Sequence, residues 1–63
     1  MLSDNIKKIR KKKGLSQDKL AKLADITHTT LVKIESGVND NPTIKTLKKI
    51  ADALEVTLDE LVS

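Results

Sequence analysis

Hydrogen-bonding side chains are concentrated on one short segment near the middle of the chain, which contains Thr27, His28, Thr29 and Lys33. Leu31 and Ile34 recur in the same segment at helical spacing, so we predict a helix that buries its apolar residues and exposes the polar ones. Hydroxyl, imidazole and ammonium groups can hydrogen-bond to base edges and phosphates. A small chain that exposes such a helix is expected to present it to a ligand, and we predict the major groove of double-stranded DNA.

The inventory of residue types argues against catalysis. The chain has no cysteine, a single histidine and no glycine-rich phosphate loop, and no acid pair lies near a matching base. A multi-ligand zinc site would have to be built from carboxylates, which rarely form one without histidine or cysteine. We therefore expect no enzymatic activity and no metal, cofactor or small-molecule ligand.

Charge is distributed unevenly between the two halves of the chain. Residues 1–33 contain nine Lys or Arg against three Asp, whereas residues 34–63 contain three Lys against six acids, and the net charge is +3. A basic half beside an acidic half fits a protein that turns one face toward a polyanion. The alternative is that the lysines simply lie on solvated faces.

Length and hydrophobicity indicate one small domain. The 63 residues, of which 38% are hydrophobic and none is aromatic, suffice for a single aliphatic core in a domain spanning residues 1–63. No apolar run reaches the length of a membrane span, and no signal peptide follows Met1. The absence of cysteine suits a reducing compartment. We therefore expect a cytoplasmic protein with no membrane association.

Apolar periodicity and capping residues predict an all-α chain of five helices. We expect the first helix at residues 3–13, a second from Ser16 to the turn Ala24-Asp25-Ile26, and a third from Thr27 to about Ser36. A fourth helix follows Thr43, and a last short helix follows Thr57. The predicted N-caps are, in chain order, Ser3 or Asp4, Ser16, Thr27, Thr43 and Thr57. Glu60 is placed to complete a capping box in the last helix. Asp25 is predicted to adopt a left-handed or a bridging conformation in the turn between the second and third helices.

The predicted core consists of the apolar residues that recur along these helices. Its members are Ile6, Ile9, Leu20, Ala21, Leu23, Ala24, Ile26, Leu31, Ile34, Ile44, Leu47, Ile50, Ala51 and Leu54. Leu58, Leu61 and Val62 give the last helix an apolar edge. This edge can fold back on the first helix, or part of it can form a dimer interface, and the sequence is compatible with both.

Several short motifs occur in order along the chain: Ile6-x-x-Ile9-Arg10, Gly14-Leu15-Ser16-Gln17, Leu20-Ala21, Ile26-Thr27, Ile34-Glu35-x-Gly37, Asn41-Pro42-Thr43, Leu47-x-x-Ile50-Ala51-x-x-Leu54 and Leu58-x-x-Leu61. In this order and spacing, residues 5–61 resemble the lambda-repressor-like, Cro-type (XRE) helix-turn-helix domains. The resemblance implies a compact five-helix fold in which residues 16–36 form the helix-turn-helix unit. One departure is Asp25, at a turn position where the family usually has glycine.

The resemblance also implies sequence-specific DNA binding by a homodimer on a palindromic operator, most often in repression of transcription. The positions that read bases in the family correspond to His28, Thr29 and Lys33. Contacts to the DNA backbone are expected from Ser16, Gln17, Thr27 and Asn41. Arg10 and Glu35 match a pair that links the first helix to the end of the third.

Some of these residues also have a plainer interpretation. His28 can be an ordinary surface histidine, and Lys33 can donate to guanine or to phosphate. Val32 can place a methyl group against a thymine methyl, or it can be a casually exposed residue at the edge of the core. For the whole domain, the alternative is a protein-interaction module of the antitoxin or regulatory-partner type. Such surfaces favour aromatic, Met and Arg anchors, whereas this helix offers Thr, His and Lys.

Overall fold

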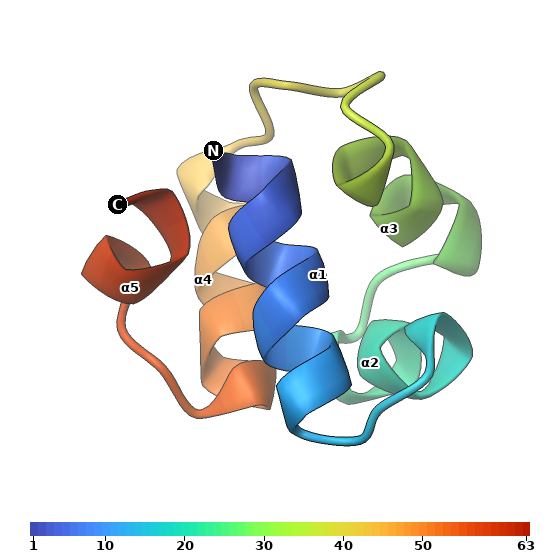
Figure 1. Cartoon of the computed structure of the whole chain (residues 1–63). Coiled ribbons are helices and arrows are strands. Elements are labelled where there is room, and N and C mark those ends of the chain that lie inside the picture. The colour runs from blue at the N-terminus through green and yellow to red at the C-terminus, as the bar shows by residue number, and fades with distance from the viewer.

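The computed structural model describes all 63 residues, which form five α-helices and no β-strand. The helices are α1 (Leu2–Lys12), α2 (Gln17–Ala24), α3 (His28–Glu35), α4 (Ile44–Leu54) and α5 (Leu58–Val62). α2 packs against α3 and α4, whereas α1 packs against α3 and α5 (Figure 1). The prediction of an all-α, five-helix fold is confirmed. None of the helices has the length and apolar character needed to cross a membrane.

Four of the five helices begin at the predicted capping residue. The hydroxyl oxygens of Ser16, Thr27, Thr43 and Thr57 each accept a hydrogen bond from the backbone N–H three residues later, at 3.0–3.2 Å. These bonds satisfy N–H groups that have no partner within the helix. At α5 the Glu60 carboxylate in turn accepts a hydrogen bond from the backbone N–H of Thr57, which completes the predicted capping box.

The start of α1 differs from the prediction. The helix begins at Leu2 and its N-cap is Met1, so the assignment of Ser3 or Asp4 as the cap is wrong. The carbonyl oxygen of Met1 accepts a helical hydrogen bond from the backbone N–H of Asn5 at 2.9 Å. Leu2 packs against the core, and the helix begins two or three residues earlier than a cap at Ser3 or Asp4 would give.

The turns that separate the helices use left-handed backbone conformations. Asp25, in the turn between α2 and α3, has φ 56° and ψ 45°, which is the left-handed of the two predicted conformations. Glu55, at the end of α4, has nearly the same conformation with φ 60°, and the sequence did not predict it. Gly14 and Gly37 follow α1 and α3 with φ of 72° and 83°. Glycine adopts such values without the steric cost that a Cβ brings.

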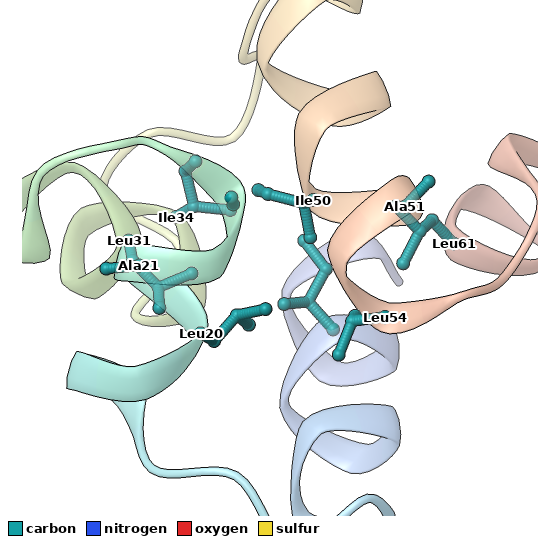
Figure 2. Packing of buried hydrophobic residues seen from close by; sticks show 10 residues of the cluster. Leu20, Ala21, Leu31, Ile34, Ile50, Ala51, Leu54 and Leu61 are labelled. Carbon is teal, nitrogen blue, oxygen red and sulfur yellow. The ribbon is translucent and has the colours of Figure 1, made fainter.

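All five helices contribute to one aliphatic core (Figure 2). Its ten buried residues are Ile6, Leu20, Ala21, Ala24, Leu31, Ile34, Ile50, Ala51, Leu54 and Leu61. The buried side of α2 includes the small residues Ala21 and Ala24, which allow close approach of the helices that pack against it. The core therefore holds α2 and α3 in a fixed relation to the rest of the chain.

Two residues predicted for the core lie outside it. Leu23 is 55% exposed at the rim between α2 and α4, where Lys49 and Ala53 are its neighbours across a shallow depression. Ile44 is 68% exposed because it is the first residue of α4 and projects beyond the end of the core. Periodicity identified a helix face correctly in both cases but did not indicate where the covering helices end.

The apolar edge of α5 folds back on α1. Leu61 is fully buried and Leu58 packs against the core, whereas Val62 is 54% exposed. The side-chain amide of Asn5 in α1 donates hydrogen bonds to the backbone carbonyls of Leu61 and Ser63, at 2.9 and 3.1 Å. Most of this edge is therefore core, and only Val62 is left for an outside contact.

Candidate nucleic-acid interface

The exposed side of α3 carries the residues predicted to read bases. His28, Thr29, Val32 and Lys33 are all exposed, and their spacing places them on one side of the helix. The opposite side is buried through Leu31, Ile34 and Glu35. The exposed side offers an imidazole, a hydroxyl, a methyl-bearing surface and an ammonium group, which together suit the donor, acceptor and methyl pattern of the major groove.

The first turn of α3 is fixed by a pair of threonine hydroxyls. The Thr27 oxygen accepts the backbone N–H of Thr30, and the Thr27 hydroxyl donates to the Thr30 hydroxyl oxygen at 2.7 Å. The Thr27 proton is thus used within the helix.

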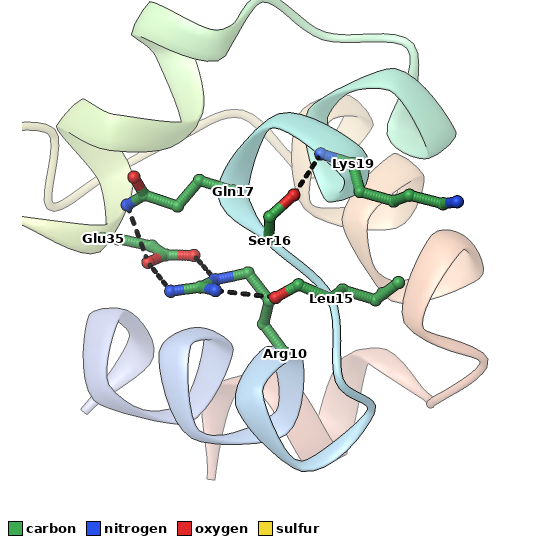
Figure 3. A network of polar contacts seen from close by, with 6 residues as sticks. All are labelled: Arg10, Leu15, Ser16, Gln17, Lys19 and Glu35. Atoms are coloured by element: carbon green, nitrogen blue, oxygen red, sulfur yellow. Dashed lines mark hydrogen bonds and ion pairs between the residues drawn. The ribbon is translucent and has the colours of Figure 1, made fainter.

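The first turn of α2 faces the end of α3. Ser16 caps the helix, and the side-chain amide of Gln17 donates a hydrogen bond to the Glu35 carboxylate at 3.0 Å (Figure 3). Gln17 is half-buried, so its side chain is held in place by α3. The sequence did not reveal this contact, since nothing in the spacing of two residues eighteen positions apart predicts that their side chains meet.

Glu35 also forms an ion pair with Arg10 of α1. Arg10 Nε donates to Glu35 Oε2 at 2.7 Å and Nη2 donates to Oε1 at 3.1 Å, while Nη1 donates to the backbone carbonyl of Leu15 at 2.8 Å (Figure 3). The two charged side chains are only 10% and 2% exposed. Both charges are therefore removed from water and satisfied by each other, in the bidentate geometry that suits guanidinium and carboxylate.

The order of the helices, the left-handed turn after α2 and the exposed polar side of α3 are the features of a helix-turn-helix. The family model for helix-turn-helix domains matches residues 6–61. The chain belongs to the helix-turn-helix family. This membership confirms the resemblance to XRE-type domains that the motifs indicated.

Related helix-turn-helix proteins are regulators of transcription. The domain is 43% identical over 61 residues to the HTH-type transcriptional regulator SlrR of Bacillus subtilis (strain 168), covering 97% of this chain and 40% of that protein. It is 35% identical over 63 residues to the regulator SinR of Bacillus licheniformis, covering all of this chain and 57% of that protein. This domain thus spans about half the length of the curated relatives it matches.

A solved structure shares the whole helix-turn-helix fold. The crystal structure of the master regulator for biofilm formation SinR in complex with DNA superposes with a TM-score of 0.96 at 35% identity, and each chain covers the other completely. Every helix of this domain therefore has a counterpart in that structure.

The loop between α3 and α4 of this helix-turn-helix domain contains Asn41. The side chain of Asn41 is exposed, and its backbone N–H donates to Asn39 Oδ1 at 3.2 Å. Asn39 is itself bound to the end of α3, through its N–H and the carbonyl of Lys33 at 2.9 Å. Pro42 is buried. These contacts hold the loop against α3 and leave the Asn41 amide free of protein partners.

Proposed function

We propose that this domain binds double-stranded DNA in a sequence-specific manner and regulates transcription without catalysing a reaction. The observation that carries the proposal is the exposed polar side of α3, backed by a fully buried apolar side. The basic bias of residues 1–33 and the regulators among its relatives support it. α3 lacks the aromatic, Met and Arg anchors that a protein-binding surface would favour.

In the proposed complex, α3 lies in the major groove. Residues 1–63 act as one domain, and residues 16–36 are the helix-turn-helix unit that contacts the DNA. His28, Thr29 and Lys33 donate or accept hydrogen bonds at base edges, and Val32 contacts a thymine methyl. Contacts to the DNA backbone come from Ser16, Gln17, Thr27 and Asn41. The start of α2 favours a phosphate, since its N–H groups and helix dipole attract an anion.

We further propose that the protein represses transcription as a homodimer on a palindromic operator. Two-fold symmetric proteins match two-fold symmetric sites, and one domain with a single recognition helix reads only a short half-site. The exposed Val62 at the end of α5, away from the polar side of α3, is compatible with a contact between two copies.

Selection of bound sequences from a randomised duplex pool tests the proposal. We expect a palindromic consensus, and an association constant for it that falls steeply with salt, with a log–log slope of about −0.9 per phosphate contacted. A single half-site in the selected pool would argue for binding as a monomer. Equal affinity for selected and random duplexes at every salt concentration would contradict sequence-specific recognition of DNA.

Substitutions on α3 test the individual base contacts. His28→Ala and Lys33→Ala are each expected to reduce discrimination at one or two base positions by about 1–3 kcal/mol, since a base contact is lost. Binding to a panel of single-position operator variants measures this. Gln17→Ala is the matched comparison, because losing a backbone contact should weaken all duplexes by a similar factor. A uniform loss in the α3 variants as well would show that they contact only the backbone.

A further inference from the structure

The carboxylate of Glu35 accepts hydrogen bonds from two residues, the buried Arg10 and the half-buried Gln17 at the start of α2. Its Oε1 atom accepts hydrogen bonds both from Arg10 Nη2, at 3.1 Å, and from Gln17 Nε2, at 3.0 Å (Figure 3). Glu35 is 4% exposed and belongs to α3, Arg10 belongs to α1, and Gln17 is the first residue of α2. One buried acceptor thus joins the three helices at the point where α2 and α3 meet.

A carboxylate only accepts hydrogen bonds, so it decides which way the Gln17 amide is turned. The NH₂ group must face Glu35, because the amide oxygen would be repelled there. An amide NH₂ has two N–H groups, and Glu35 takes one of them. The other forms no hydrogen bond within the protein and remains available to an outside acceptor at the start of α2.

We infer that Glu35 is a positioning residue for DNA binding: through its hydrogen bond it holds the free N–H of Gln17 ready for a phosphate. Arg10 is the second half of the arrangement, since it neutralises a carboxylate that would otherwise repel a phosphate near Gln17. The inference rests on the proposed function and adds to it. Neither Arg10 nor Glu35 touches DNA in this arrangement, and both act through Gln17.

Pre-organisation of this kind has a measurable effect on affinity. A glutamine side chain that is free in solution loses rotamer freedom when it binds, and a side chain already held by the protein does not. Loss of the Glu35 hydrogen bond is therefore expected to weaken DNA binding about twofold to tenfold.

The test must remove the acceptor without unfolding the chain. R10M/E35L replaces the ion pair by apolar side chains of similar size, a change that leaves no buried charge unpaired and keeps the net charge unaltered. R10M/E35Q is its partner, because the glutamine oxygen restores an acceptor for Gln17 without a carboxylate. Circular dichroism and thermal unfolding first establish that both variants are folded at the assay temperature.

Gln17→Ala is then introduced into the wild type and into both double variants, and dissociation constants are measured on a selected duplex. In the wild type the substitution is expected to weaken binding about tenfold, the worth of a hydrogen bond to a charged group. In R10M/E35L we expect only about a twofold effect, because the amide is no longer held. R10M/E35Q should recover most of the wild-type factor. The effects of Gln17→Ala and of the loss of Glu35 on the dissociation constant are then non-additive. A purely structural role of Glu35 would leave them additive.

The same Gln17→Ala factor in all three backgrounds would overturn the inference, as would the absence of any Gln17 effect in the wild type. Both results are distinct from failure of the proposed function, in which the unaltered chain would show no preference for any duplex over random DNA.

Discussion

Glu35→Ala is expected to lower the free energy of unfolding by about 3–5 kcal/mol, because it leaves the buried guanidinium of Arg10 without its counter-charge. Arg10 would retain only the hydrogen bond to the Leu15 carbonyl. A chain of this length is expected to have a total stability of roughly 3–9 kcal/mol. The variant should therefore lose a large share of the total stability, and a chain at the lower end of this range would be largely unfolded at room temperature.

Chemical denaturation followed by circular dichroism measures the change in the free energy of unfolding. Two further variants serve as controls for it. R10M/E35L is expected to stay much closer to the wild type, because no unpaired charge remains. Asp18→Ala removes one partner of the ion pair between Asp18 and Lys22, whose side chains are 64% and 78% exposed, and is expected to cost about 0–1 kcal/mol. A loss under 1 kcal/mol for Glu35→Ala would show that the Arg10 charge is rehydrated easily.

Ile50→Ala is expected to lower the free energy of unfolding by about 2–5 kcal/mol, through lost transfer energy and the cavity left behind. Ile50 is fully buried, and it belongs to a core cluster that contains residues from all five helices (Figure 2). In a core built only from aliphatic side chains and alanine, no large aromatic ring is at hand to fill the space.

Ile44→Ala provides the matched comparison, since it makes the same chemical change on the same helix. Ile44 is 68% exposed, so its truncation is expected to change the unfolding free energy by no more than about 0.5 kcal/mol. Equilibrium unfolding in urea, with both variants measured in parallel, gives the difference. Similar losses for the two variants would contradict core packing as the source of the Ile50 effect, because alanine is a better helix former than isoleucine and propensity cannot account for a loss.

The amino-acid sequence by itself determined the local structure of this protein. Four caps, the left-handed turn at Asp25 and the five helices depend on residues within a few positions of one another, and such short-range signals can be read along the chain. Ordered motifs over residues 5–61 also indicated the family, which the match to residues 6–61 confirms.

Only the tertiary structure decided which residues meet. It showed that Glu35 joins Arg10 to Gln17, that Leu23 and Ile44 lie outside the core, and that α1 begins at Leu2. Periodicity defines a helix face but carries no information on where a covering helix ends. A hydrogen bond between residues eighteen positions apart produces no pattern in the local sequence. Such contacts exist only once the core has fixed how the helices cross.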